Sequence, residues 1–183
     1  MSKTQKTRAA LTRAALELFE ERGYEATSTA AIAERAGVSA MTFFRYFPSK
    51  DAVLMDDPYD PLIAEAIAQQ PRHKSALAAT LGGVADAWHS VPPPAEGEVR
   101  ERLRIVARTP SLRGGMARNS AVSEEAIADA LRARGVADRE ARIAASATIA
   151  ALNAALLHWA ENSSDDLGSA ITAALDVLEG GAG

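Results

Sequence analysis

The chain of 183 residues contains no cysteine, which excludes disulfide bonds and thiolate metal sites. It also has no apolar run near 18 residues and no apolar signal-peptide segment, and residues 1–6 are polar and basic. From these absences we expect a cytoplasmic protein that makes no use of a membrane. No convincing alternation of apolar and polar residues marks a strand, and no internal repeat is present. The sequence therefore predicts an all-α fold.

Histidine is scarce as well. The three histidines, at His73, His89 and His158, belong to no recognisable metal or nucleophile motif. His158 and Glu161 lie three residues apart on a predicted helix and could bind a metal or shuttle protons, but a surface or core pair explains that spacing more often. The sequence therefore predicts no cofactor, no metal site and no catalytic residue, and an α-helical enzyme is the least favoured hypothesis.

The composition is that of an ordinary globular protein, with 48% apolar and 24% charged residues, and the length allows one or two domains. The net charge of −4 hides an asymmetry. Residues 1–50 hold 8 Lys and Arg against 5 Asp and Glu, whereas residues 51–183 hold 12 against 19. A positive end on an acidic body can orient a protein on DNA. Basic side chains that could contact phosphates, or else lie in solvent, are Lys3, Lys6, Arg8 and Arg13.

The most informative stretch is residues 27–50, which reads as two short helices joined by a glycine turn. Gly37 follows the first helix at the position where a left-handed residue commonly ends one. Ser39 can cap a second helix, expected over residues 40–46, and Pro48 stops it. Such a turn alone is weak support, because two short helices and a glycine are common in all-α proteins.

The second of these helices has an inner and an outer face. Phe43 faces inward and Phe47 follows four residues later. The outward positions are Ala40, Met41, Phe44 and Arg45. A helix-turn-helix places the N-terminal part of its second helix against base edges in the major groove. Ala40 permits close approach to DNA, and Met41 could make apolar contact with a thymine methyl group.

At these residues the sequence resembles the TetR family of transcriptional regulators. The matching stretches are residues 23–27, 32–39 and 42–50. The resemblance implies an N-terminal three-helix helix-turn-helix DNA-binding domain, expected at 4–57, and a C-terminal helical domain for effector binding and dimerisation, expected at 58–179. It also implies a homodimeric repressor that binds a palindromic operator on double-stranded DNA and is released by a small molecule.

The resemblance carries specific contacts over to this chain. The matched DNA-contact positions are Ser28, Thr29, Ala40, Met41, Thr42, Phe44, Arg45, Tyr46 and Lys50. Family members often have a long polar side chain where this chain has Ala40 and a glycine where it has Met41. They usually have a tyrosine at the position of Phe44, which lacks the hydroxyl that would bond a phosphate, and Tyr46 could supply that bond instead. These departures affect which operator is read, not whether DNA is read.

Apolar spacing outside the motif predicts further helices. They are expected at about 4–22, 50–57, 61–69, 75–90, 96–108, 110–134, 138–163 and 165–179. Residues 57–61 should end the helix at 50–57 and mark the boundary between the domains. The Gly82–Gly83 pair could permit a kink or the close approach of a neighbouring side chain. The helix at 110–134 is expected to break near residues 114–115 and to restart at Ser123. The tail at 180–183 is expected to be disordered.

The last two predicted helices are expected to pair protomers into a four-helix bundle. The residues predicted for this interface are Ile143, Ala147, Ala150, Ala151, Ala154, Ile171, Ala174, Leu175 and Leu178. The alternative is that they form intramolecular core. Because a palindrome needs two reading heads, the function favours a homodimer.

The middle helices should enclose a pocket for a largely apolar effector. The candidate lining residues are Ile63, Ile67, Trp88, His89, Ile105, Leu112, Met116, Asn153 and Trp159, and for each of them the alternative is dry core. Arg100, Arg104 and Arg108 recur every four residues on one helix face. This stripe is either a solvated face, with Glu96 and Glu101 as partners, or a dock for an anionic group.

A second, weaker resemblance concerns the C-terminal half. Residues 104–113, with the later Trp159, are similar to actinobacterial members of the family related to the mycofactocin regulator. This resemblance implies an acyl-coenzyme A or a similar long acyl ligand. The alternative to a ligand-responsive repressor is a sequence-tolerant architectural DNA-binding protein whose affinity rests on phosphate contacts. The short basic stretch and the acidic body argue against that alternative.

Overall fold

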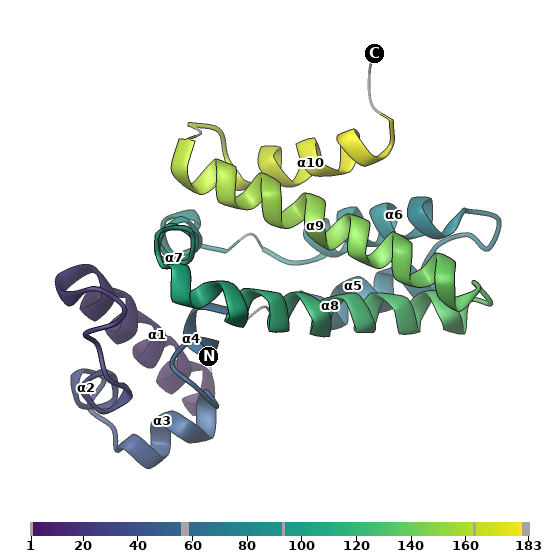
Figure 1. The fold of residues 1–183 in the computed structure, drawn as a ribbon. Coiled ribbons are helices and arrows are strands. Elements are labelled where there is room, and N and C mark those ends of the chain that lie inside the picture. The colour runs from purple at the N-terminus through teal and green to yellow at the C-terminus, as the bar shows by residue number, and fades with distance from the viewer. Residues whose placement is uncertain (1, 56–58, 93, 163, 181–183) are drawn as a thin grey trace. The chain divides into compact units, whose positions relative to one another are not determined.

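The computed structural model describes residues 2–55, 59–92, 94–162 and 164–180, and the regular structure of this part of the chain is entirely helical (Figure 1). The elements are α1 (Lys3–Arg22), α2 (Thr29–Arg35), α3 (Ala40–Tyr46), α4 (Ala52–Met55), α5 (Asp60–Gln69), α6 (Ala76–Ser90), α7 (Glu96–Arg108), a 3-10 turn η1 (Pro110–Leu112), α8 (Arg113–Ala133), α9 (Asp138–Asn162) and α10 (Leu167–Leu178). The predicted all-α fold is confirmed.

A few predictions fall where the structure makes no description. The end of the helix expected at 50–57, the start of the break at 57–61 and the domain boundary at 57/58 involve residues 56–58, which lie outside the described residues. The same holds for residue 163, at the end of the helix expected at 138–163, and for residues 181–183 of the expected tail.

The chain divides into two compact units. The first unit comprises Met1–Asp56 and Glu101–Met116, and the second comprises Asp57–Arg100 and Ala117–Gly183. Helices α7 and α8 therefore each contribute residues to both units. Residues 101–116 group with the N-terminal helices, although they follow the sequence position at which the domains were expected to divide.

In the first unit, α2 and α4 pack on the longer α1, and α3 packs on α2. Its buried apolar core is made of Leu11, Ala14, Ala15, Leu16, Leu18, Phe19, Ile32, Ala33, Phe43, Phe47, Val53, Leu54, Val106 and Leu112. α1 begins with a capping box, in which the Ser2 hydroxyl accepts from Gln5 N at 3.2 Å and Gln5 Oε1 accepts from Ser2 N at 2.7 Å. Lys3 and Lys6 are therefore part of the helix rather than of a flexible arm.

In the second unit, α5 and α6 pack unusually closely. A Cβ atom placed on Gly83 would lie 2.9 Å from the backbone nitrogen of Ile67 and would also clash with the Ile67 side chain. α6 nevertheless runs without interruption from Ala76 to Ser90. The glycine pair at 82–83 therefore serves the close approach of a neighbouring helix and not a kink.

The predicted break in the long helix after residue 110 is wrong. α8 is continuous from Arg113 to Ala133, and only the η1 turn interrupts the path before it. Ser123 is not an N-cap but a buried residue inside the helix, where its hydroxyl donates to Asp60 Oδ2 at 2.9 Å. Because its hydroxyl has partners in Asp60 and in the Asn119 carbonyl one turn earlier, Ser123 is accommodated inside the helix and does not mark its start.

α9 and α10 lie side by side in the second unit (Figure 1). α10 begins at Leu167, where the Asp166 carboxylate caps the helix by accepting from Ser169 N at 2.7 Å. Among the described helices, α9 alone is long and apolar enough to cross a membrane, with a mean hydropathy of 1.4 in its most apolar window. Core helices of soluble proteins meet the same criterion, so this property is weak support for a membrane span.

Long basic side chains bind the ends of several helices. Arg134 donates to the carbonyl oxygens of Ile67, Gln70 and Pro71 at the end of α5, at 3.0, 2.5 and 2.8 Å. Arg102 donates twice to the carbonyl oxygen of Leu54 in α4. Each guanidinium group thereby supplies donors to carbonyl oxygens in or just beyond the last turn of a helix.

Arg100 makes a similar contact at the end of α9. It donates to the carbonyl oxygens of Trp159 and Asp165 at 3.0 and 3.1 Å. Its guanidinium carbon lies 4.0 Å from the centroid of the Trp159 ring, in cation–π geometry. The Trp159 indole N–H donates to the same Asp165 carbonyl at 2.8 Å. The two side chains together hold the turn between α9 and α10.

Candidate nucleic-acid interface

The turn between α2 and α3 has the geometry that its sequence predicts. Gly37 has a φ of +70°, and its N–H donates to the Glu34 carbonyl at 3.0 Å. The N–H of Val38 donates to the Ala33 carbonyl at 2.9 Å, which closes the end of α2. Ser39 then caps α3 by accepting from Thr42 N at 3.2 Å. α3 consequently begins at Ala40 and ends at Tyr46, as the sequence predicts.

Two phenylalanines fix the orientation of α3. Phe43 and Phe47 are 0% and 1% exposed, and their ring centroids lie 5.8 Å apart. Because both point into the core, the opposite face of α3 is turned to solvent. On that face Met41 is 84% exposed and Phe44 is 54% exposed, the latter with its ring edge-on to Phe43. α3 thus presents apolar side chains to solvent next to the exposed, cationic Arg45.

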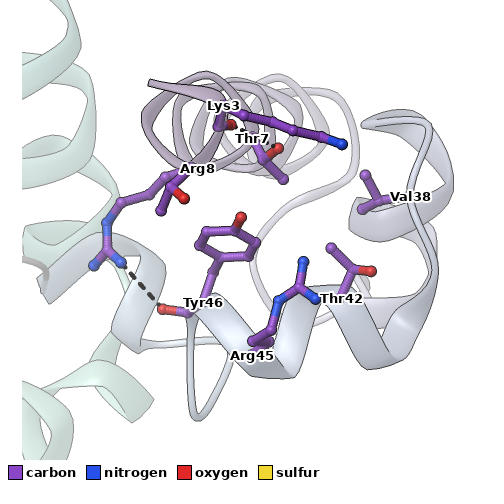
Figure 2. A pocket seen from close by; sticks show the side chains of 8 residues that line it. Lys3, Thr7, Arg8, Val38, Thr42, Arg45 and Tyr46 are labelled. Carbon is purple, nitrogen blue, oxygen red and sulfur yellow. Dashed lines mark hydrogen bonds between the residues drawn. The ribbon is translucent and has the colours of Figure 1, made fainter. Parts of the chain in front are cut away.

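A groove of about 710 Å³ lies between the N-terminal part of α1 and α3 (Figure 2). Its lining residues are Lys3, Thr4, Thr7, Arg8, Val38, Thr42, Arg45 and Tyr46. Three of these eight side chains are cationic and none is acidic. Such a lining favours an anion. Because the groove lies beside α3, a phosphate group of a nucleic acid is an anion that suits it.

The tyrosine of α3 points into this groove (Figure 2). Burial acts to raise the pKa of Tyr46, but hydrogen bonding with Thr7, Arg45 and Thr4 outweighs it and lowers the pKa. Arg8 of α1 donates to the Tyr46 carbonyl at 3.2 Å and stacks 4.6 Å from the centroid of the Phe47 ring. α1 therefore holds the C-terminal turn of α3 in place.

Sequence reasoning did not identify Thr4, Thr7 and Val38 as residues beside this surface. A signal was present, because Thr4, Thr7 and Arg8 recur at intervals of three and four residues and so share one face of α1. Their position against α3 depends on tertiary packing and cannot be read from α1 alone.

The remaining predicted contact residues lie around α2 and α3. Ser28 is exposed and caps α2, with its hydroxyl accepting from Ala31 N at 3.1 Å. Thr29 and Thr42 are half-buried, and the Thr42 hydroxyl lies 3.0 Å from that of Ser39. Ala40 is exposed at the start of α3. The structure therefore brings eight of the nine predicted contact residues to α2 and α3.

Lys50 differs from the other eight. Its ammonium group donates to the carbonyl oxygens of Tyr24 and Thr27, at 2.7 and 2.9 Å, in the turn between α1 and α2. It also lies 4.0 Å from the centroid of the Tyr24 ring. Burial raises the pKa of Tyr24 to about 12, and the charges of Asp51 and Glu25 add to the shift. The side chain predicted to reach DNA is thus bound within the first unit.

The predicted effector residues are divided between the two units. Ile105, Leu112 and Met116 belong to the first unit, and the other six belong to the second. Ile67 and Trp159 are packed core residues with 0% and 1% exposure. The remaining members of the set in the second unit are half-buried, exposed or at the edge of the core: Ile63, Trp88, His89 and Asn153.

The arginine stripe on α7 is likewise divided. Arg100 belongs to the second unit and holds the turn after α9, whereas Arg104 and Arg108 are exposed residues of the first unit. Glu96, expected as a solvated partner of this stripe, instead accepts from the backbone N–H of Leu167 at 3.1 Å.

Most of the residues predicted for a dimer interface are accessible on α9 and α10. Ile143 is 63% exposed, and Ala150 and Ala154 are exposed further along the same face. The half-buried members of the set are Ala147, Ala151, Ile171, Leu175 and Leu178. Ala174 is the exception, because it is only 4% exposed and packs inside the chain itself. Because Ala174 is buried within its own chain, it is removed from the set of predicted interface residues.

The hypothesis that His158 and Glu161 bind a metal or transfer protons finds no support in the geometry. His158 and Glu161 are both exposed, and the ring of His158 lies 3.5 Å from the Asn162 amide. In the part of the chain that the structure describes, no group of three His, Cys, Asp or Glu residues could hold a metal ion.

Comparison with known proteins supplies the family context for this geometry. Residues 11–55 match the sequence model of the bacterial regulatory proteins of the tetR family, and residues 74–183 match that of the MftR C-terminal domain. The chain is 33% identical to the HTH-type transcriptional regulator TcmR of Streptomyces glaucescens over 142 residues, 72% of this chain and 62% of TcmR. It therefore spans less than two thirds of that relative's length.

Two further proteins resemble it over most of its length. The putative mycofactocin biosynthesis transcriptional regulator MftR of Mycobacterium tuberculosis is 28% identical over 175 residues, which are 91% of this chain and 86% of MftR. The crystal structure of FadR of Thermus thermophilus, a TetR family repressor in complex with lauroyl-CoA, matches the fold with a TM-score of 0.51 at 23% identity. That match covers 94% of this chain and 93% of FadR.

Proposed function

The chain belongs to the TetR family of bacterial regulatory proteins, whose members are DNA-binding transcription regulators and not enzymes, and from this premise we propose that it is a homodimeric repressor of a palindromic operator. The observation that carries the proposal is α3, a short capped helix whose exposed face combines Met41 and Phe44 with Arg45. This face has the composition needed to contact both base edges and phosphates.

Eight of the predicted DNA contacts remain part of the proposal. The side chains proposed to face the duplex are Ser28, Thr29, Ala40, Met41, Thr42, Phe44, Arg45 and Tyr46. Thymine is the only base whose major-groove edge carries a methyl group, so the exposed apolar side chains of α3 match thymine better than any other base. The cationic groove between α1 and α3 suits an adjacent backbone phosphate.

We assign DNA binding to residues 4–57, and effector binding and dimerisation to residues 58–179. The two family matches, at 11–55 and 74–183, support this division. Residues 101–116 belong by sequence to the second of these regions, but they are part of the compact unit that contains α3. We propose that the protein acts in the cytoplasm, where the DNA that a bacterial regulator binds is found.

The proposed dimer uses the outer faces of α9 and α10. Ile143 and Val177 are 63% and 76% exposed, and alanines line the rest of the α9 face. Only 33% of the most apolar window of α9 is buried within the chain. Small residues allow helices to approach closely, and a twofold pair of such helices would cover apolar surface that is otherwise in water. Two protomers would then present two reading helices to a palindrome.

The effector is proposed to be a small, largely apolar molecule, with an acyl-coenzyme A as the first chemical class to test. The match of residues 74–183 to the MftR C-terminal domain and the fold similarity to FadR, a repressor in complex with lauroyl-CoA, support this choice. Arg104 and Arg108, exposed on α7, are cations within the chain that could meet an anionic part of such a ligand.

Fluorescence anisotropy with duplexes from the upstream region of the protein's own gene tests the proposal. The purified protein should bind one such duplex far more tightly than a scrambled duplex of equal length, with two protomers per duplex. Arg45→Ala should weaken binding while the dimer persists in sedimentation. Glu34→Ala, an exposed change on α2 that removes a negative charge, serves as the control and should not weaken binding.

Equal, strongly salt-dependent binding to both duplexes would instead favour an architectural DNA-binding protein. Once a specific duplex is known, release by lauroyl-CoA but not by free coenzyme A would support an acyl effector. A monomer at micromolar concentration, bound singly to the specific duplex, would contradict the dimer.

A further inference from the structure

Lys50 is the side chain for which the geometry departs most from the expected role. The ammonium group of a lysine has three N–H donors and no acceptor. Two of them are directed at the carbonyl oxygens of Tyr24 and Thr27, at 2.7 and 2.9 Å. The Tyr24 ring, with its centroid 4.0 Å away, occupies a third side of the ammonium group. The cation is therefore coordinated by its own protein on three sides.

The residues that Lys50 holds form the turn leading into α2. The Thr27 N–H donates to the Tyr24 carbonyl at 3.2 Å, so both ends of this turn converge on the ammonium group. The Thr27 hydroxyl is buried and donates to the carbonyl oxygens of Leu18 and Gly23, at 3.2 and 2.9 Å. Thr27 immediately precedes Ser28, the N-cap of α2.

We propose that Lys50 is a positioning residue, which clamps the turn between α1 and α2 and thereby fixes the first helix of the helix-turn-helix, rather than a ligand of a DNA phosphate. The inference rests on the proposed function, because the reading of DNA gives the clamp its purpose. We call Lys50, Tyr24 and the Thr27 carbonyl together the Lys50 clamp.

The two roles predict different dependences on salt. A lysine that neutralises one phosphate contributes about 0.9 to the slope of log K against log salt concentration, because it releases a counterion. A lysine that only orients other groups contributes nothing to that slope, although its loss weakens binding. Stability without DNA also differs, since removal of a clamp destabilises the free protein and removal of an exposed phosphate ligand does not.

The test compares Lys50→Met with Arg45→Met in the full chain. Both substitutions remove one positive charge and keep an unbranched apolar side chain. For each protein we would measure the thermal midpoint without DNA, the affinity for the operator at a temperature where the protein is fully folded, and the salt slope of that affinity. Amide hydrogen exchange over residues 27–31 would report on the turn itself.

For Lys50→Met we expect a lower thermal midpoint, faster exchange at residues 27–31, and an operator affinity lowered about tenfold, comparable to the loss of one base-pair contact. Its salt slope should equal that of the wild type. Arg45→Met should keep the thermal midpoint and lose about 2 from the slope, since each of the two protomers on the duplex loses one phosphate contact. Loss of about 2 from the slope of Lys50→Met, with unchanged stability, would overturn the proposal. An unchanged affinity with lowered stability would overturn the positioning role as well.

Lys50→Arg provides a second variant that keeps the positive charge. A planar guanidinium group cannot replace a compact ammonium with two carbonyls and a ring around it, so this variant should show the same loss of protection at residues 27–31. Full recovery of affinity and protection in Lys50→Arg would show that charge alone matters, against the clamp. Should the wild type bind no specific duplex, the proposed function fails, while hydrogen exchange in the variants still tests the clamp.

Discussion

The two units of the chain are stabilised in different ways. In the first unit, α2 and α3 have seven residues each and α4 has four, well below the 12–15 residues at which isolated helices become marginally stable. Serine caps begin α2 and α3, and the Lys50 clamp holds the turn before α2. Arg35 also pairs α2 with Glu17 and Glu21 of α1. In the second unit, α9 has 25 residues and α6 has 15; buried alanines line both helices, and Gly83 adds a close approach on α6.

The difference indicates what each unit is built to do. Directed polar contacts hold the short helices at defined positions while leaving one face of α3 in solvent for a partner. Close packing of small residues in the second unit leaves helices that are joined along their lengths, with an apolar outer face on α9 and α10. Loss of a cap or of the Lys50 clamp should therefore act locally on the short helices of the first unit, whereas added volume between helices should act through steric fit in the second.

The largest expected effect is that of Phe43→Ala, which removes the ring at the centre of the first unit. We expect a loss of about 3–5 kcal/mol in the free energy of unfolding of that unit, because the ring is fully buried. Both tryptophans, Trp88 and Trp159, belong to the second unit, so tryptophan fluorescence reports on it separately. The urea midpoint from circular dichroism should fall more than the fluorescence midpoint. Equal shifts would show that the units unfold as one.

Gly83→Ala should have the next largest effect and tests steric fit in the second unit. The added methyl group meets the backbone of α5, which cannot move without shifting the helix, so we expect a loss of about 1–3 kcal/mol. Gly82→Ala is the matched control. Its methyl group meets the ends of the Gln70 and Lys74 side chains and no backbone atom, so these ends can shift at the cost of the hydrogen bond between them. Fluorescence-detected urea unfolding should therefore rank Gly83→Ala well below Gly82→Ala, and a reversed order would contradict the close approach of α5.

Ser39→Ala should cost about 1 kcal/mol, because it removes the N-cap of α3. Ser75→Ala removes the equivalent cap of α6 and should cost a similar amount. Only Ser39→Ala should also weaken operator binding, since the frayed turn contains Ala40 and Thr42. Anisotropy titration beside urea unfolding measures both quantities. Equal loss of affinity in the two variants would show that general stability, and not the local cap, controls DNA reading.

Replacement of thymine by deoxyuridine in the operator should have a smaller effect. This change removes only the methyl group, so we expect a loss of about 0.8 kcal/mol, roughly fourfold in affinity, at a base that Met41 contacts. The Met41→Ala variant should lose nothing further from the same replacement. If wild type and Met41→Ala respond equally at every thymine, the exposed apolar face of α3 reads no methyl group.

The smallest effect concerns pH. The Arg35 guanidinium donates to both carboxylate oxygens of Glu21, at 2.9 Å each, and this hydrogen bonding lowers the pKa of Glu21 below its usual 4.5. A lowered pKa in the folded state means that the contribution to stability is present above pH 4.5 and is lost as the pH falls through the lower value. Glu21→Gln should therefore flatten the acid limb of a circular dichroism titration slightly. An unchanged limb would show that this ion pair adds nothing measurable.

Local signals in the sequence were sufficient for the helix-turn-helix. A cap at Ser39, a left-handed glycine at Gly37 and the inward Phe43 define the bounds of α3 within a few neighbouring residues. The capping box of Ser2 and Gln5 is equally local, and it is the signal for the start of α1 that the sequence interpretation missed.

The errors concern contacts between residues far apart in the chain. The break expected at residues 114–115 assumed that glycine weakens a helix, but Gly115 lies against Asp51, where a Cβ atom would come within 2.7 Å of Oδ2. Ser123 looked like a cap because its hydroxyl partner, Asp60, is 63 positions away. The partners of Lys50 could not be predicted from the sequence either, since no periodicity indicates that a side chain binds a backbone carbonyl.

The contacts between basic side chains and backbone carbonyls affect which substitutions this sequence can accept during evolution. Lys50 at Thr27, Arg102 at Leu54 and Arg134 at Ile67 each hold a backbone carbonyl oxygen, which every amino acid has, so the residue that carries it can change without loss of this hydrogen bond. The constraint falls on one partner only. Searches for pairs of positions that vary together would therefore miss these contacts, even though each joins segments at least 23 positions apart.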